Sequence, residues 1–109
     1  MVVERRRILA DFTQAVNMSA DELDAWLETP ESLAVGQKED GGESIGHASG
    51  RRIAAILRRP EAELGESDLA HIRKTIGFIR RHRAREPANM VTSRWRYSLM
   101  NWGHDPLNG

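Results

Sequence analysis

Apolar side chains recur at the three- and four-residue spacing of an α-helix along most of this chain, in segments separated by capping residues and prolines. No stretch shows the alternation of apolar and polar residues that a half-buried β-strand requires. Helical spacing gathers the apolar residues on one face, which must be buried against another element. The pattern predicts an all-α fold, a compact bundle of five or six helices with two long amphipathic helices at its centre. A length of 109 residues suffices for one such domain, spanning residues 1–109, with a single modest core.

The expected helix boundaries follow from capping residues and prolines. Ser19 opens a capping box with the glutamate three residues later. Pro30 fits a first helical position, and Pro60 ends a helix because proline cannot continue one. The polar, glycine-rich stretch 36–43 is expected to form a loop, and Ser67 to cap the longest helix. The expected helices lie at about 2–16, 19–27, 30–35, 44–59, 67–85 and 92–102.

Net charge is zero, but the charge is unevenly distributed. Residues 1–50 contain four basic and ten acidic side chains, whereas residues 51–109 contain twelve basic and six acidic ones. Fourteen of the sixteen basic residues are arginine, whose planar guanidinium suits bidentate contact with phosphate or carboxylate. Two interpretations are open at this point. The halves neutralise each other across an internal interface, or a basic surface stays free for a partner.

The expected helix 44–59 separates small and apolar residues from arginines. Its predicted core side comprises Ile45, Gly46, Ser49, Gly50, Ile53, Ile56 and Leu57. Its opposite side comprises Arg51, Arg52, Arg58 and Arg59, with His47 at the edge. Because Gly46 and Gly50 lie four residues apart, we expect another helix to approach closely there. Ser44 and the first amides of this helix also form a candidate anion site, although a serine cap alone predicts the same residues.

The expected helix 67–85 divides in a similar way. Its predicted core stripe comprises Leu69, Ile72, Ile76 and Ile79. Its other side carries His71, Lys74, Phe78, Arg81, His82 and Arg85. An apolar ring among cations is unusual on a free surface. We therefore expect Phe78 either to be covered by the C-terminal segment or to stack on a nucleic-acid base.

Residues 94–106, RWRYSLMNWGHDP, contain three of the six aromatic residues of the chain. One face of the helix expected here carries Val91, Trp95, Leu99 and Trp102, which we predict to be core residues. The opposite face carries Arg94, Tyr97 and Asn101, and we expect it to be polar and exposed. The segment is thus predicted to be a lid on the core, not a platform of three aromatic rings.

No pattern indicates a metal site, a cofactor or catalysis. The four histidines lack the i, i+4 spacing of helical ligands, and without cysteine no thiolate can complete a site. Neither a Gly-x-Ser-x-Gly elbow nor a Walker loop is present. An enzyme or a small-anion binder would have to be centred on His47, Arg51 and His104, which requires a fold that brings them into one cleft.

The sequence also bears on location. No apolar run approaches the roughly 18 residues that a membrane span needs. The N-terminal stretch MVVERRRILADF lacks the continuous apolar region and the cleavage site of a secretion signal. The absence of cysteine fits a reducing compartment. We expect a cytoplasmic protein without membrane association.

Three segments, ESIGHASGRRIAAILRR, HIRKTIGFIRRH and RWRYSLMNWGHDP, together resemble the domain-of-unknown-function family 3140, found in bacteria and in some fungal proteins. The resemblance covers about residues 20–107, and the last segment is its most specific part. The family's signature positions correspond to Gly46, His47, Ser49, Gly50, Arg51, Arg52, Arg94, Trp95, Arg96, Tyr97, Trp102, Gly103 and His104. The resemblance implies a small helical protein of a kind often labelled DNA-binding, and it implies no catalytic residues.

These observations predict a small DNA-binding protein whose arginine-rich helix faces contact the phosphate backbone. The residues expected to contact nucleic acid or an anion are Ser44, His47, Arg51, Arg52, Arg58, Arg59, Lys74, Phe78, Arg81, Arg85, Arg94 and Tyr97. Phosphate contacts carry no sequence information, so we expect weak sequence specificity. The alternative is a protein-interaction module, in which the acidic half of one copy meets the basic helices of another in a homodimer.

Overall fold

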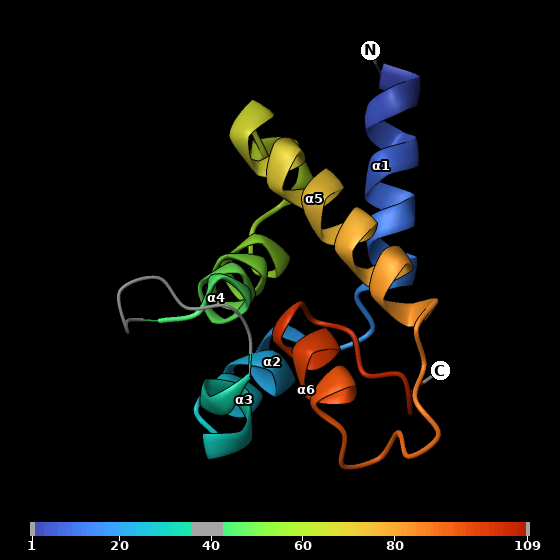
Figure 1. The fold of residues 1–109 in the computed structure, drawn as a ribbon. Helices are drawn as coiled ribbons and strands as arrows, with labels where there is room; N and C mark the ends of the chain where they lie inside the picture. Colours follow the sequence, from blue (N-terminus) through green and yellow to red (C-terminus); the bar gives the residue numbers. More distant parts are fainter. Residues whose placement is uncertain (1, 36–42, 109) are drawn as a thin grey trace.

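Six α-helices and one short 3₁₀ turn make up the computed structural model, which describes residues 2–35 and 43–108 (Figure 1). The elements are α1 (Val2–Ala15), α2 (Ala20–Leu27), α3 (Pro30–Ala34), α4 (Ile45–Leu57), η1 (Glu61–Glu63), α5 (Glu66–Arg83) and α6 (Arg94–Asn101). The predicted all-α bundle is confirmed. Of the loop expected at 36–43, only Glu43 lies within the described residues. No helix in the described ranges is long and apolar enough to cross a membrane.

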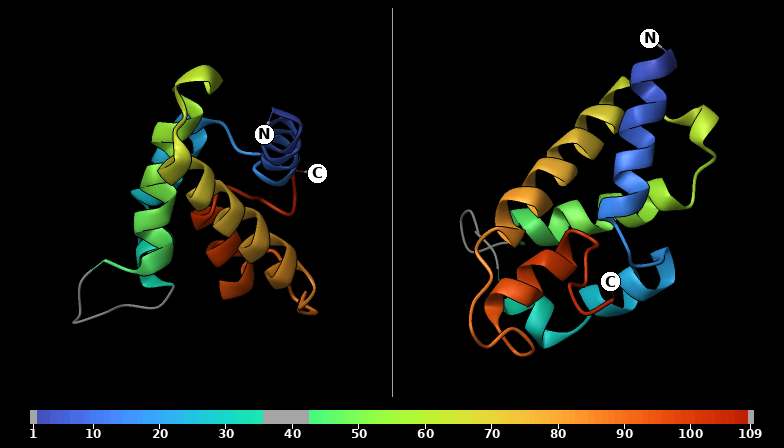
Figure 2. Two further views of the ribbon diagram at one scale, coloured as in Figure 1. Left: turned by 90° about the horizontal axis from the view of Figure 1, so that it is seen from above. Right: turned by 90° about the vertical axis from the view of Figure 1, so that its right-hand side faces the viewer.

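The helix α6 closes the core between the other helices. α1 packs along α5 and α2 packs along α4, whereas α6 contacts α2, α3, α4 and α5 (Figures 1 and 2). Leu23, Ile53, Ile72 and Leu99 come from four different helices, and each is 0% exposed. The apolar stripes predicted for the two long helices therefore meet in one core, with α6 over their junction.

The start of α5 differs slightly from the prediction. The helix begins at Glu66, because the carboxylate of Asp68 accepts a hydrogen bond from the backbone amide of Gly65 at 3.0 Å. Ser67, the predicted cap, lies inside the helix. Its hydroxyl instead accepts a hydrogen bond of 2.7 Å from Arg52 of α4.

The start of α6 also differs. Ser93 caps this helix and accepts a hydrogen bond from the backbone amide of Arg96 at 3.1 Å, so the helix begins at Arg94 instead of residue 92. Val91 precedes the helix and is 52% exposed. The prediction that Val91 belongs to the core is therefore wrong, because Val91 lies before the capping residue Ser93 and does not follow the spacing of the helix.

The helix that approaches the glycines of α4 is α6. A Cβ atom on Gly50 would lie 2.3 Å from the backbone oxygen of Asn101 and 2.8 Å from the side chain of Leu27. A Cβ atom on Gly46 would lie 3.1 Å from the indole Nε1 of Trp102. Contacts below 3.0 Å with backbone exclude any larger residue at Gly50 without moving α6. The predicted close approach is confirmed at both positions.

The segment that follows α6 is bonded to the link between α1 and α2. Gly103 ends the helix with a φ of 85°, in the left-handed region that glycine adopts without steric cost. Its backbone oxygen accepts a hydrogen bond from the amide of Met18 at 3.2 Å. Asn17 and Asp105 exchange two further hydrogen bonds, of 2.9 and 2.8 Å. Residues more than 80 positions apart in the sequence are thereby held together.

Candidate functional site

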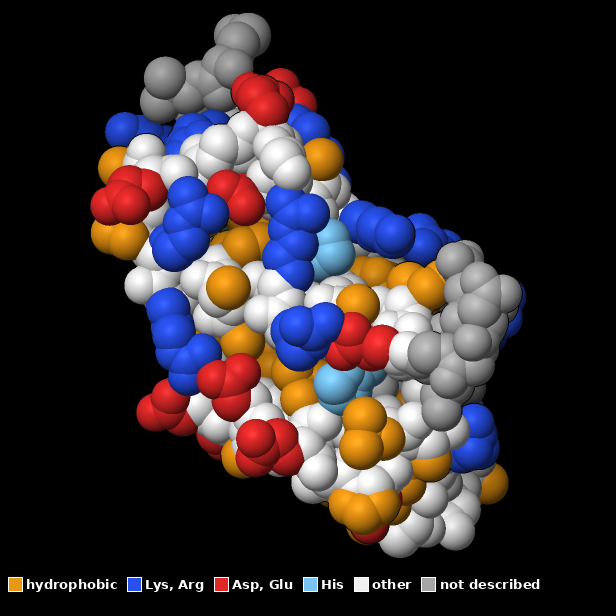
Figure 3. All heavy atoms as spheres, turned by 90° about the vertical axis from the view of Figure 1, so that its left-hand side faces the viewer, with side chains coloured by type: hydrophobic (Ala, Val, Ile, Leu, Met, Phe, Trp, Pro, Cys, Tyr) orange, Lys and Arg blue, Asp and Glu red, His pale blue; other side chains and the backbone are white. Residues whose placement is uncertain are grey.

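The four arginines predicted for helix 44–59, called the arginines of α4 below, are engaged within the molecule, although α4 ends at Leu57 and Arg58 and Arg59 directly follow it. All four form ion pairs, and three of their four carboxylate partners come from the acidic half of the chain. The pairs are Arg51–Glu43, Arg52–Asp68, Arg58–Asp21, Arg58–Asp24 and Arg59–Asp68. Positive and negative side chains are accordingly interleaved on the molecular face shown in Figure 3. The interpretation that the two halves neutralise each other holds for this helix.

Glu43 and His47 complete the network at the start of α4. The pKa of Glu43 is lowered to about 2, chiefly by the hydrogen bond from Arg51 and to a smaller extent by His47. The ring of His47 bonds to Glu43 through Nδ1 and to the backbone oxygen of Leu27 through Nε2, the latter at 2.6 Å. Ser44 is 2% exposed, and its hydroxyl accepts a hydrogen bond from the amide of His47. The polar side-chain atoms of Ser44 and His47, both predicted to bind an anion, are thus bonded inside the protein.

The basic residues on the outer stripe of α5, counted together with Arg85 just past the end of the helix at Arg83, have a different environment. Lys74, Arg81 and Arg85 are exposed, and none of them forms an ion pair with a carboxylate of the described residues. Arg94, at the start of α6, is also exposed and donates a hydrogen bond of 3.1 Å to the backbone oxygen of Ala34. It too has no carboxylate partner within the described ranges. These four residues are called the unpaired cations below.

Five aromatic rings from α5 and α6 form a continuous stack, called the ring column below. Its order is His71, Trp102, Phe78, His82 and Trp95. The ring centroids of successive members lie 6.1, 4.4, 5.0 and 6.2 Å apart, with interplanar angles of 13° to 16°. Phe78 therefore has a ring on each side. Of the two expectations for Phe78, the structure shows coverage by the C-terminal segment, and neither face of this ring is free to stack on a base.

Burial in the ring column affects both histidines. Desolvation lowers the pKa of His71 and the pKa of His82 below the ordinary value. Nearby cations lower the pKa further, Arg52 and Lys74 at His71 and Arg85 at His82. Nε2 of His71 lies 2.8 Å from the hydroxyl of Ser49, whereas Nε2 of His82 is buried with no hydrogen-bond partner among the described residues. Both rings are consequently harder to protonate than an exposed histidine.

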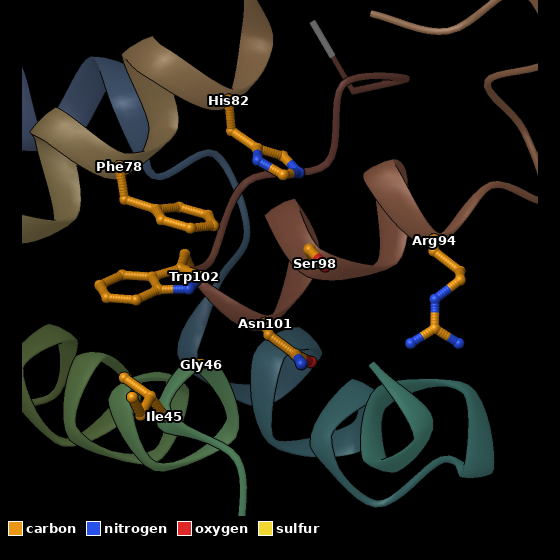
Figure 4. A pocket seen from close by; sticks show the side chains of 8 residues that line it. All are labelled: Ile45, Gly46, Phe78, His82, Arg94, Ser98, Asn101 and Trp102. Atoms are coloured by element: carbon orange, nitrogen blue, oxygen red, sulfur yellow. The ribbon is translucent and has the colours of Figure 1, made fainter. Parts of the chain in front are cut away.

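A cavity of about 390 Å³ lies beside the ring column, between α4, α5 and α6 (Figure 4). Its lining residues are Ile45, Gly46, Phe78, His82, Arg94, Ser98, Asn101 and Trp102. A smaller hollow of about 210 Å³ is lined by Phe78, Arg81, His82 and Arg85. Because the two share Phe78 and His82, they form one depression with arginines at both ends. This depression is called the basic groove below.

The face of α6 opposite the ring column is less open than predicted. Asn101 is 0% exposed, and its Oδ1 accepts hydrogen bonds from Trp26 Nε1 (2.7 Å) and from the Ser32 hydroxyl. Its Nδ2 donates to the backbone oxygen of Ser32 at 3.1 Å. Tyr97 is half-buried and packs on Trp26, with ring centroids 5.4 Å apart. The prediction of an exposed polar face holds for Arg94 and is wrong for Asn101, because α2 and α3 cover this side.

The structure does not assemble the cluster on which an enzyme or small-anion binder would depend. His47 and Arg51 share Glu43 at the start of α4, and His47 contacts α2. His104 is 4% exposed and its Nδ1 donates to the backbone oxygen of Ala15, at the end of α1, at 2.6 Å. Burial lowers the pKa of His104. Within the described ranges, no three histidine or acidic side chains are grouped so as to hold a metal ion.

A family model described as "Protein of unknown function (DUF3140)" matches residues 11–100. The chain belongs to the DUF3140 family. The DUF3140 match includes α2 to α5 and most of α6, and it ends before the Gly-His-Asp-Pro stretch that the resemblance had included. No curated protein and no solved structure matches the chain.

The ring column of this DUF3140 protein is the feature that sequence reasoning missed. A usable signal was present, since Phe78 lies seven residues after His71 and Trp102 lies seven residues after Trp95. Equal spacing on two helices favours facing stripes. The histidines had been placed with the cations instead, because histidine is commonly a polar surface residue.

Proposed function

We propose that this protein is a small DNA-binding protein that contacts the phosphate backbone through the basic groove of α5 and α6. One observation carries the proposal: the unpaired cations have no carboxylate among the described residues, and three of them line one depression. A guanidinium without an internal partner attracts phosphate, and its planar donors fit two phosphate oxygens. A cytoplasmic location is part of the proposal and fits a chain without cysteine.

The proposed contact set is narrower than the one expected from the sequence. The α4 arginines are left out, because each would have to exchange an existing carboxylate for a phosphate. The same reasoning leaves out Ser44 and His47, whose polar side-chain atoms are already bonded. Phe78 enters only as part of the groove wall, and Tyr97 is left out because it packs on Trp26 at the other side of α6.

Binding of this kind is expected to depend strongly on salt. Each phosphate that a cation neutralises releases condensed counterions from the DNA. Four phosphate contacts on duplex DNA correspond to a log–log slope of affinity against salt of about −3 to −4. Sequence preference should be weak, because none of the four cations needs to reach a base edge.

Fluorescence anisotropy with labelled DNA of about 25 bases, single-stranded and duplex, tests the proposal across a salt series. Arg81→Ala combined with Arg85→Ala should weaken binding by about tenfold or more and reduce the slope by about 2. The matched control is Arg51→Ala combined with Arg58→Ala, which removes the same charge from the paired helix and should leave binding nearly unchanged. Equal losses in both double variants would contradict the proposed site, and no binding at low salt would end the DNA proposal.

The alternative function is that of a charge-complementary homodimer, and the ion pairs within the chain disfavour it. Asp21, Asp24 and Glu43 already neutralise arginines of α4, so fewer acidic groups are available to a second copy. We expect a monomer by light scattering at low and at high salt. A mass near twice that of the chain, falling as salt rises, would favour the dimer instead.

A further inference from the structure

We propose that the 390 Å³ cavity beside the ring column binds one unpaired base of a single-stranded DNA whose phosphates lie along the basic groove. The inference rests on the proposed function and names its preferred partner. Such a site distinguishes single-stranded from duplex DNA, because duplex DNA keeps its bases paired and stacked.

The shape of the site favours a single strand. The cavity is concave and lies between three helices, and its volume falls within the range of about 300–1,000 Å³ that is typical of pockets for small organic groups. Reading duplex DNA directly requires the opposite shape, a helix or ribbon that protrudes into a groove. An unpaired base can leave its strand and enter a pocket of this size.

The walls of the cavity match the chemistry of a base, which has apolar faces and a polar edge. In Figure 4 the ring of His82 lies over one side of the cavity and Ile45 lies on the opposite side, while the indole N–H of Trp102 is directed toward the cavity. Ile45 is 39% exposed, although the other isoleucines of α4 are buried. The faces of the His82 ring are covered by Phe78 and Trp95, so His82 contributes its edge to the wall, and the hydroxyl of Ser98 adds a hydrogen-bonding group there.

The cations are placed to hold the strand on either side of that base. Arg94 lines the cavity itself. Arg81 and Arg85 line the adjoining hollow, which shares the His82 wall. A strand with one base in the cavity can therefore place the phosphates that flank it near arginines at both ends of the groove. A positively charged groove next to ring surfaces is the arrangement by which single strands are bound without sequence preference.

The decisive experiment distinguishes the contribution of the base to the binding affinity from that of the phosphates. Anisotropy is measured at fixed low salt with labelled oligothymidine of about 12 nucleotides and with a strand of the same length and charge whose central residues are abasic. The thymidine strand should bind roughly tenfold more tightly, the order expected when the apolar surface of one base is buried in a cavity. Equal affinities would overturn the base-binding cavity while leaving the phosphate contacts intact. No binding by either strand or by duplex DNA would instead overturn the proposed function itself.

A variant locates the effect in the cavity. Ser98→Phe fills the space with a ring and leaves the three arginines of the groove in place. The abasic strand should then bind as before, and the thymidine strand should lose its advantage. Ser98→Ala keeps the cavity open and should retain most of that advantage. Full retention in a folded Ser98→Phe protein would place the base elsewhere and overturn the assignment, and if this variant does not fold, the abasic comparison with the unaltered protein still decides.

Competition with thymidine monophosphate distinguishes a strand from a free nucleotide. One phosphate and one base recover only part of the contacts, so competition should need at least about a hundredfold higher concentration than the strand. Competition at equal concentration would identify a pocket for free nucleotides and overturn the strand proposal.

Discussion

The arginines of α4 and the basic residues on the outer stripe of α5 look alike in the sequence and differ in the fold. Each of the four arginines of α4 is paired with a carboxylate, supplied by α2, by Glu43 or by Asp68. Lys74, Arg81 and Arg85 have no carboxylate partner in the described ranges, although they too occupy one side of an amphipathic helix. The number of cations on a helix therefore does not tell how many are available to a ligand.

The cause of the difference lies in which helices are neighbours. Asp21 and Asp24 of α2 meet Arg58 because α2 packs along α4, whereas the α5 stripe borders α6, which has no acidic residue in its sequence. Helical spacing identifies the face that a residue occupies. Tertiary packing determines which helix lies next to that face. The neighbouring helix in turn determines whether a cation there forms an ion pair or has no carboxylate partner.

The largest expected effect comes from removing the ring that joins α5 to α6. Trp102 is 4% exposed and stacks on Phe78 at 4.4 Å, so Trp102→Ala should cost about 3–5 kcal/mol of the free energy of unfolding. Because the arginines of the basic groove come from both helices, DNA binding should be lost with the fold. Urea denaturation measures the first effect. Leu107→Ala, at a position that is 49% exposed, is the control and should change stability by less than about 0.5 kcal/mol.

A smaller loss is expected from adding one methyl group where α4 meets α6. Gly50→Ala should cost about 1–3 kcal/mol, because its Cβ would meet the backbone oxygen of Asn101. Gly77→Ala in α5 is the matched test, since its Cβ would meet only the flexible end of Arg81 at 3.0 Å. There the better helix propensity of alanine should stabilise the protein by up to about 1 kcal/mol. Similar losses in both variants would show that α4 and α5 do not differ in this way.

Lowering the pH should affect the buried histidines and the carboxylate of Glu43 differently. Burial lowers the pKa of His71, His82 and His104 below the ordinary 6.5, so between their folded values and pH 6.5 the unfolded chain binds more protons than the folded one. Stability should therefore fall as pH is lowered from about 6.5 through the folded pKa values. Glu43, on the paired side, stays ionised until a pH of about 2.

His82→Phe measures how much His82 contributes to the loss of stability at low pH. The substitution keeps an aromatic ring in the ring column and removes one titrating group beside the unpaired cations. Thermal melting between pH 7 and pH 5 should show a shallower loss of stability than in the unaltered protein. An unchanged pH dependence would mean that His82 does not contribute to it.

The smallest expected effect concerns the ion pairs themselves. Arg51→Ala with Arg58→Ala should lower the melting temperature slightly at low salt and less at high salt, because exposed ion pairs are weak and are screened. Arg81→Ala with Arg85→Ala should leave the melting temperature unchanged or raise it slightly, since no ion pair seen in the described ranges is lost and repulsion between like charges is relieved. Equal losses would indicate that the arginines of α5 also have internal partners.

The sequence predicted what depends on local pattern and composition. The helical class, the buried stripe of Ile72, Ile76 and Ile79, and the close approach at Gly50 all follow from spacing, capping and residue size. The buried state of Asn101 did not follow, because its partners Trp26 and Ser32 lie about 70 positions away in the sequence.

The candidate site was predicted only in part. The four unpaired cations, three of which line the basic groove, were named from the sequence, but so were four arginines that the fold pairs internally. The cavity was not foreseen at all, since it is formed by three helices whose relative placement no local pattern encodes. His71 and His82 were assigned to the basic side, whereas their rings are members of the ring column.

The bonds between the segment after α6 and the link between α1 and α2 have a consequence for synthesis. Residues 94–105 leave the ribosome after almost all of the helices they hold together. Until then α4 and α5 lack Trp102, and Met18 lacks the acceptor that Gly103 provides. The nascent chain must therefore carry incompletely covered apolar stripes until this segment emerges, and the domain can be completed only in one late step that joins its first and last parts.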